Sequence, residues 1–291
     1  YGFNHVTSEK TMGLYQNNNA SQLAILTDGI YNNIDFTVNT LDNQTSLLNA
    51  LSGLNLTYFK RAPSQLFDQD AKSLNQRVAK NVSNSNKDFV TITYRVIAPP
   101  HSQLYVSVPN ISWSDDNNHS LSITVNGVTR NQVTDNTFDF FDLGYFETES
   151  MVTIKLSFPG NKVISFDNPS FYALDTKNYQ IAMDTINDRD SKVTTSNNKV
   201  FVDYSSKMNA SLFFTIPYDK GWTATINHKK VKIQRAQKGF MKVDVPSGKG
   251  KVVLTFIPYG LKTGLLISLL ASIIFCYYAY FIRKITIIRN S

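Results

Sequence analysis

Cysteine is nearly absent from this chain of 291 residues, which contains only Cys276. A single thiol cannot form an internal disulfide, and it cannot supply the ligands of a structural zinc or iron–sulfur site. The four histidines are scattered, and no two lie close enough in sequence to form a local pair of metal ligands: His5, His101, His119 and His228. Metal hydrolases and thiol enzymes are therefore poor candidates, and we expect no metal and no cofactor in this chain.

Other catalytic patterns are missing as well. No serine lies in a Gly-X-Ser-X-Gly motif, and Gly248-Lys249-Gly250 lacks the spacing of a phosphate-binding loop. The acidic stretch Asp115-Asp116-Asn117-Asn118 has oxygen ligands of the kind that Ca²⁺ takes, but we interpret it as an exposed loop. The sequence therefore names no catalytic residue.

Acidic residues are scarce in one short stretch. Residues 1–219 contain 16 lysines and arginines and 21 aspartates and glutamates, whereas residues 220–262 contain ten basic residues and only Asp244 as an acid. The basic pI of about 9.2 thus belongs to one region and not to the whole chain. A general nucleic-acid binder is a poor inference from such a distribution, and we expect no nucleic-acid partner.

Charge is absent from a long run near the C-terminus. Residues 263–282 contain no charged side chain, and as a helix they would span about 30 Å, the thickness of a bilayer's hydrocarbon core. Three tyrosines cluster near one end, and Arg283 and Lys284 follow directly. We predict a transmembrane helix over 261–282 and a basic tail over 283–291; the alternative is a buried core helix.

The orientation of this span is not decided by charge. Three basic residues lie close to it on each side, so the positive-inside rule gives a tie. The roughly 260 preceding residues contain no cysteine, which suits a bacterial surface protein. The chain begins at Tyr1 without a signal-peptide pattern, and we interpret it as the C-terminal piece of a longer protein.

The rest of the sequence predicts a mainly β protein: two β-sandwich or jelly-roll-like modules followed by one transmembrane α-helix. An Asn-rich entry segment, 1–85, contains a helix near 42–53, capped by Asp42 or Asn43 and ended by Gly53. Strands are expected at 22–26 and 33–40, and a helix or loop at 65–86. From residue 88 the sequence alternates at period two, as half-buried strands do.

The alternation defines a β-sandwich module over 86–176 and a basic, membrane-proximal β module over 177–260. In the first module we take Gln103 as a turn residue before a strand at 104–108, and Asn126-Gly127 as a hairpin turn. The second strand set begins at Tyr179, with a hairpin turn at Asn227-His228. Its lysines are expected mostly on the outer face of the sheet: Lys229, Lys232, Lys242 and Lys251.

Candidate binding residues lie in the basic module. Trp222 and nearby Tyr218 could stack on sugar rings, although packing in a core or turn is the simpler interpretation. Lys229, Lys230 and Lys232 could contact anionic lipid head groups or an anionic cell-wall polymer. Cations near an anionic surface gain ~1 kcal/mol each within a Debye length of ~8–10 Å. The alternative is a solvated sheet face.

Several stretches resemble the C-terminal end of the bacterial YfhO-type membrane proteins. The most specific is Pro217-Tyr218-Asp219-Lys220-Gly221-Trp222, and the others are 43–53, 141–146, 239–248 and 256–264. The resemblance implies a multi-spanning protein with a large extracytoplasmic β-rich region before its last span, and a cytoplasmic tail. It also implies similarity to GT-C glycosyltransferases, which take sugar from a polyprenyl-phosphate donor and here would modify lipoteichoic or wall teichoic acid.

The catalytic carboxylate of that class lies in an early external loop, so no residue of this chain takes a catalytic role by resemblance. We therefore expect an accessory region of a bacterial cell-membrane glycosyltransferase, with most of the chain outside the cell. Its partners would be the bilayer, an anionic wall polymer or lipid head groups, and the upstream transmembrane portion of the same protein. The rival hypothesis is a carbohydrate-binding or adhesive surface module without catalytic activity.

Overall fold

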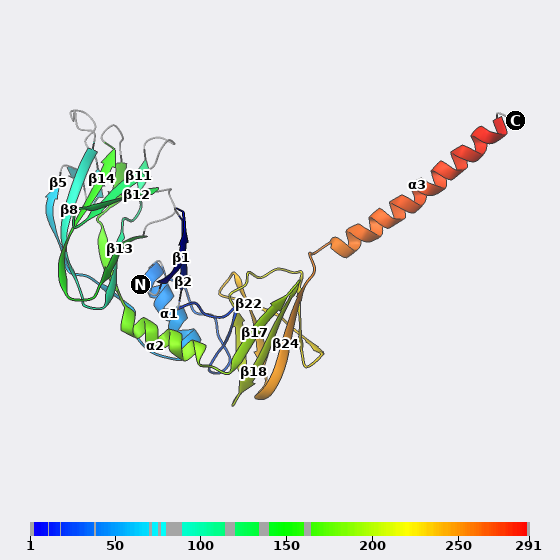
Figure 1. Ribbon diagram of the computed structural model, residues 1–291, viewed down its shortest axis with the longest axis horizontal. Helices are drawn as coiled ribbons and strands as arrows, with labels where there is room; N and C mark the ends of the chain where they lie inside the picture. The colour runs from blue at the N-terminus through cyan, green and yellow to red at the C-terminus, as the bar shows by residue number, and fades with distance from the viewer. Residues whose placement is uncertain are drawn as a thin grey trace. The chain divides into compact units, whose positions relative to one another are not determined.

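The computed structural model describes residues 3–10, 12–17, 19–37, 39–69, 72–74, 77–79, 89–113, 120–133, 140–159 and 164–289. The chain forms two compact units (Figure 1). Unit 1 comprises residues 1–20 and 35–185, and unit 2 comprises residues 21–34 and 186–291. The Asn-rich entry segment thus contributes to both units. The Ca²⁺ candidate at 115–118 lies outside the described residues.

Unit 1 is built mainly on two antiparallel sheets. The five-stranded sheet has the order β12 (Val128–Val133), β11 (Ser120–Val125), β14 (Ser150–Pro159), β8 (Phe89–Ala98), β5 (Ser64–Gln69). The four-stranded sheet has the order β13 (Phe140–Phe146), β9 (Ser102–Ser107), β16 (Ser170–Asp175), β4 (Phe59–Arg61). Smaller elements are β1 (Phe3–Glu9) with β2 (Met12–Asn17), and a sheet of β10 (Ser112–Trp113), β15 (Ile164–Asp167), β7 (Arg77–Ala79) and β6 (Lys72–Leu74).

The predicted alternation explains why the two main sheets of unit 1 form a sandwich. Along β8, Val90, Ile92, Tyr94 and Val96 are buried while the residues that alternate with them are more exposed. They share one hydrophobic core with Leu104 and Val106 of β9, on the other sheet. Side chains alternate between the two faces of a strand, so each sheet contributes one face to this core. The mainly β fold and its sandwich architecture are confirmed.

Two helices accompany the four-stranded sheet of unit 1 (Figure 1): α1 (Thr40–Ser52) and α2 (Thr176–Asn187). The helix predicted near 42–53 is confirmed. Its N-cap is Asn39, whose Oδ1 accepts from the Leu41 amide at 3.0 Å, so the predicted caps were placed three or four residues too late. Gly53 ends the helix as expected, with φ 75° and its amide donating to the Asn49 carbonyl.

Three local predictions were wrong. Residues 65–86 were expected to be a helix or loop, but the described part forms strands β5, β6 and β7. The strand expected at 33–40 is absent from the described residues there, and Thr40 already begins α1. Tyr179 lies in α2 and not in a strand. At 33–40 the apolar side chains do alternate, so the local pattern alone did not decide the structure there. Tyr179, Ala182, Met183 and Ile186 have helical spacing, which the strand prediction overlooked.

Unit 2 is a second sandwich, with one buried core shared by its two sheets. One sheet has the order β17 (Ser191–Ser196), β18 (Lys199–Ser206), β24 (Gly248–Phe256), β20 (Trp222–Ile226), β21 (Lys229–Val231). The other has the order β22 (Gln234–Ala236), β23 (Phe240–Val245), β19 (Ala210–Phe214), β3 (Ala24–Leu26). Strand β3, far away in sequence, pairs Leu26 with Leu212 and so ties residues 21–34 into this unit.

Lys242 was expected on the outer face of a sheet, but the structure buries it. Its Nζ donates to the Tyr31 carbonyl at 2.6 Å and lies 3.1 Å from Asp244 Oδ1. Burial of Asp244 favours its neutral form, but hydrogen bonds from Ser211, Lys242 and Gln234 outweigh this and lower the pKa of the carboxyl. A buried cation needs such a partner, so Lys242 anchors residues 21–34 to the sheet.

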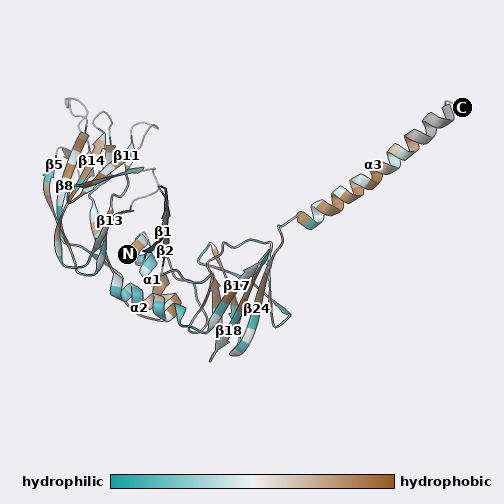
Figure 2. Ribbon diagram, viewed as in Figure 1, coloured by the Kyte–Doolittle hydropathy of each residue, from teal (hydrophilic) through white to brown (hydrophobic). Residues whose placement is uncertain are grey.

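Helix α3 (Leu261–Arg289) contains the predicted span. Residues 261–282 form one uninterrupted helix, long and apolar enough to cross a membrane, with none of it buried in protein. Its ribbon is mostly in the hydrophobic colour over these residues (Figure 2), and consecutive apolar residues such as Leu265, Leu266 and Ile267 are all exposed. A helix that is apolar on every side needs an apolar surrounding. The alternative of a buried core helix is wrong for these residues.

Candidate functional site

The candidate lysines lie on and beside a tight hairpin of unit 2. Asn227 and His228 have φ angles of 46° and 69°, which a two-residue turn of this kind requires, so the predicted turn is confirmed. Lys229 and Lys230 follow on β21, paired with Ile226 and Thr225 of β20. We call Lys229, Lys230 and Lys232 the basic hairpin; all three side chains are exposed.

The charge of the basic hairpin is not neutralised internally. None of its three lysines forms an ion pair within the described part of the chain, in contrast to Lys251, which lies 3.7 Å from Asp203, and to buried Lys242. Strand β21 is also at the edge of its sheet. Lysines on an edge strand discourage unwanted pairing with another sheet. The three cations are thus available for an anionic partner, and Lys229 and Lys230 also protect this edge.

Tyr218 and Trp222 lie in the turn that carries the most specific sequence motif. Asp219 Oδ1 accepts from the Gly221 amide at 2.6 Å, and a Cβ at position 221 would collide with the Ile257 carbonyl oxygen, so only glycine fits there. Trp222 packs on Phe256 with ring centroids 4.9 Å apart. The Arg235 guanidinium lies over the Tyr218 ring, with its Cζ 4.8 Å from the ring centroid. Both aromatic side chains are partly buried against the core of unit 2.

The structure does not bring the two groups of candidates together. Trp222 pairs with Phe256, at the end of the sheet that leads into α3, whereas Lys229 pairs with Ile226 at the other end of β20. At ~3.3 Å per residue, these two ends of the strand are about 13 Å apart. The basic hairpin and the aromatic turn are therefore separate features of unit 2.

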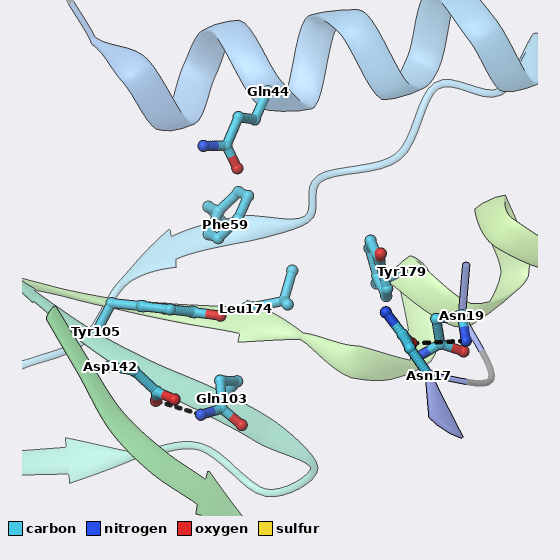
Figure 3. Close-up of a pocket in the computed structure, with 9 residues that line it drawn as sticks. All are labelled: Asn17, Asn19, Gln44, Phe59, Gln103, Tyr105, Asp142, Leu174 and Tyr179. Carbon is cyan, nitrogen blue, oxygen red and sulfur yellow. Dashed lines mark hydrogen bonds between the residues drawn. The ribbon is translucent and has the colours of Figure 1, made fainter. Parts of the chain in front are cut away.

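A cavity that the sequence did not predict lies in unit 1, between α1 and the four-stranded sheet (Figure 3). It consists of two adjoining hollows of about 340 Å³ and about 550 Å³. The two hollows share four lining residues: Gln44, Phe59, Tyr105 and Asp142. This volume is in the range typical of small-molecule sites, ~300–1,000 Å³.

The floor of the cavity is the sheet face opposite the sandwich core. Leu104 and Val106 of β9 are buried in that core, so Gln103 and Tyr105 project from the other face. Asp142 of β13 is paired with Tyr105 and shares this face. Phe59 of β4 packs edge-on against Tyr105, with ring centroids 6.2 Å apart. Two aromatic rings and two polar groups thus converge below Gln44 of α1.

A bulge directs Asp142 toward Gln103. The register of β13 against β9 shifts between Asp142 and Gly144, and Gly144 has φ 109°. Asp142 Oδ1 accepts from the Gly144 amide at 2.8 Å and from Gln103 Nε2. Bulges of this kind re-aim a side chain relative to a regular strand. Here the bulge provides a carboxylate held in place by two donors.

Gln103 carries a carbonyl oxygen without a partner. The residue is 6% exposed, and its Oε1 has no hydrogen-bond partner among the described residues. A carboxylate can only accept, so Nε2 must face Asp142 and the Oε1 atom is left over. A buried polar atom without a partner costs about 1–3 kcal/mol. The sequence did not predict Gln103 as a site residue because we interpreted it as a turn residue. It is the second residue of β9.

Burial raises the pKa of Tyr105 to about 12, and the negative charge of Asp142 and the neighbouring Tyr179 contribute further. The hydroxyl therefore keeps its proton at neutral pH and is available as a donor. The described residues that line the two hollows include one carboxylate, Asp142, and no Lys, Arg or His. The cavity is thus polar and aromatic, and it attracts no anion.

Comparison with known proteins assigns the family. Residues 1–268 match the family described as bacterial membrane protein YfhO. The chain belongs to the YfhO family. A 110-residue stretch is 27% identical to the uncharacterized protein YfhO of Bacillus subtilis (strain 168), and it covers 36% of this chain and 13% of that protein. The chain is thus similar to a small part of a much longer relative.

Two solved structures give no further argument. A crystal structure of a conserved protein of unknown function from Pseudomonas aeruginosa PAO1 covers 67% of this chain and 92% of its own, with 9% identity and a TM-score of 0.17. A 7S globulin from Momordica charantia covers 68% and 79%, with 9% identity and a TM-score of 0.12. The family assignment confirms the resemblance seen in the sequence motifs and makes this chain part of a membrane protein.

Proposed function

We propose that this chain is the extracytoplasmic accessory region of a glycosyltransferase that uses a polyprenyl-phosphate-linked sugar. In this proposal α3 is the last span, the tail after it is cytoplasmic, and the catalytic residues belong to the upstream transmembrane portion. The basic hairpin contacts the anionic acceptor, a lipoteichoic or wall teichoic acid, and holds it near the membrane. The observation that carries the proposal is membership in the YfhO family over residues 1–268.

The distribution of charge supports this assignment of roles. Ten of the basic residues lie within 220–262, next to the span, and the three lysines of the basic hairpin are exposed and unpaired within the described residues. Exposed cations attract a polyanion over a distance of about one Debye length, ~8–10 Å at physiological salt. Repeated phosphates would gain from several such contacts at once. An uncharged acceptor would gain nothing from them.

The test replaces Lys229, Lys230 and Lys232 by Gln in the full-length protein and measures the sugar content of the teichoic acids. We expect sugar content to fall while the amount of protein in the membrane is unchanged, because all three side chains are exposed. A control removes the same charge from Lys155, Lys177 and Lys192, which are also exposed. Unchanged glycosylation in the hairpin variant would remove the acceptor role.

A further inference from the structure

The cavity of unit 1 has a chemistry that the basic hairpin does not share. Its described lining combines aromatic rings with uncharged amides, a single carboxylate and no cation. Phosphate groups need cations or clustered amide donors, so a phosphate-rich ligand does not fit. A lipid tail would leave the Gln103 carbonyl without a partner and would cover the charged Asp142 carboxylate with apolar groups, at a cost.

The aromatic part of the lining suits a ring with an apolar face. Phe59 and Tyr105 lie edge to face, 6.2 Å apart between centroids, and Leu174 lies beside them (Figure 3). The C–H face of a pyranose is apolar, and it buries well against aromatic side chains that carry a polar atom at one end. The rim of the same ring carries hydroxyl groups that need both donors and acceptors.

The polar part of the lining provides those donors and acceptors. Gln103 Oε1 is an acceptor without a partner among the described residues, and a sugar hydroxyl is a donor that can satisfy it. Gln44 extends from α1 above Phe59 toward the same space (Figure 3). Its amide can both donate and accept. The carboxylate of Asp142 accepts strongly from neutral hydroxyls and repels anions.

We infer that this cavity is a binding site for a short neutral saccharide, packed on Phe59 and Tyr105 and hydrogen-bonded by Gln103, Gln44 and Asp142. The site lies wholly in unit 1 and is separate from the basic hairpin of unit 2. The inference does not depend on the acceptor role of that hairpin. It assigns sugar recognition to one unit and anion recognition to the other.

The test uses the full chain, with Lys229, Lys230 and Lys232 replaced by Gln so that the basic hairpin binds no anion, in phosphatidylcholine nanodiscs, which carry no sugar head groups. The probes are maltose and N,N′-diacetylchitobiose, which are neutral, and digalacturonic acid, which is anionic. Binding is measured by saturation-transfer NMR and by calorimetric titration. We expect at least one neutral probe to bind, with saturation transferred to ring C–H protons, and digalacturonic acid not to bind.

Three variants locate the binding in the cavity. Gln103→Met and Gln44→Ala should each weaken the binding of the neutral probe about tenfold, since each removes a hydrogen bond to the ligand. Gln103→Met also removes the hydrogen bond from Nε2 to Asp142, so Gln44→Ala, which breaks no such bond to Asp142, separates the loss of a ligand contact from a displacement of that carboxylate. Asp142→Asn keeps the shape and should allow digalacturonic acid to bind.

Ser46→Ala is the matched control, because Ser46 is exposed on the same helix as Gln44 and does not line the cavity. It should bind like the unchanged chain. The inference is overturned if no neutral probe binds, or if Gln103→Met and Gln44→Ala bind as tightly as the control. Either failure leaves the basic hairpin proposal intact, since none of the probes carries a phosphate.

Discussion

The two units have the same kind of core but differ in what they present to a ligand. In unit 1, helix α1 and the outer face of a sheet enclose a cavity with aromatic rings, amides and one carboxylate. In unit 2, the exposed polar features are cations on an edge hairpin, and the lysine that is buried already has a partner. In the two proposals above, the first arrangement binds the hydroxyl groups of a neutral saccharide, and the second binds negative charge.

This difference follows from what covers each sheet. Unit 1 has helices against its outer sheet face, so Gln103 is buried and Tyr105 is half-buried away from the main core. Unit 2 has the edge strand β21, where a charged side chain costs little free energy because water solvates it.

We expect the largest effect from a core truncation, which tests whether the two units unfold separately. Leu212 on β19 is fully buried in the core of unit 2, and Leu212→Ala should lower the free energy of unfolding by about 2–5 kcal/mol. Each unit has its own tryptophan at its core, Trp113 in unit 1 and Trp222 in unit 2. The melting temperature reported by Trp222 fluorescence, measured in a Trp113→Phe background, should therefore fall. The melting temperature reported by Trp113 should be unchanged.

A matched change in unit 1, Leu104→Ala, should give the reverse result, because Leu104 is buried only in the core of that unit. A downward shift of both tryptophan signals in either variant would show that the units unfold together, and the comparison between them would then lose its physical basis.

A smaller effect is expected from the buried ion pair of unit 2. Among the described residues, Asp244→Ala leaves the buried Lys242 ammonium with the Tyr31 carbonyl as its one hydrogen-bond acceptor. Asp244 itself is partly exposed, so we expect a cost of about 2 kcal/mol, at the lower end for broken ion pairs. Asp203→Ala is the control, because its pair with Lys251 is exposed at both ends, and it should change little.

The same pair makes the stability of unit 2 depend on pH. The pKa of Asp244 is lower in the folded state, so its contribution is present above the unfolded pKa of about 3.9 and is lost as pH falls through the folded pKa. The melting temperature of unit 2 should therefore fall in acid more steeply in the unchanged chain than in Asp244→Ala. Parallel curves for the two proteins would contradict this role.

Much of the fold was predictable because its period was clear. Strand β8 alternates over ten residues, and the turns at Asn126-Gly127 and Asn227-His228 carry the residues that positive φ angles favour. The span was predictable because charge is absent from it. Helix α2 was missed although Tyr179, Ala182, Met183 and Ile186 recur at helical spacing and the last three are buried.

Among the candidate sites, only the one built from neighbouring residues was predictable. The basic hairpin was predicted because its turn and its lysines are adjacent in sequence. The cavity joins Gln44, Phe59, Gln103 and Asp142 from α1, β4, β9 and β13, and only the strand order brings them together. Lys242 was placed wrongly for the same reason, since its partner carbonyl at Tyr31 lies 211 residues away.

The smallest expected effect concerns the bulge that shapes the cavity. Gly144 has φ 109° with open space where a Cβ would stand, so Gly144→Ala has no clash but strains the backbone, at a cost of about 1 kcal/mol. The strained strand should also move Asp142 away from Gln103. We expect a small drop in the unit 1 melting temperature together with weaker binding of the neutral saccharide. Gly239→Ala, at an ordinary φ in unit 2, is the control. If the two substitutions changed saccharide binding equally, the bulge at Gly144 would have no role in shaping the cavity.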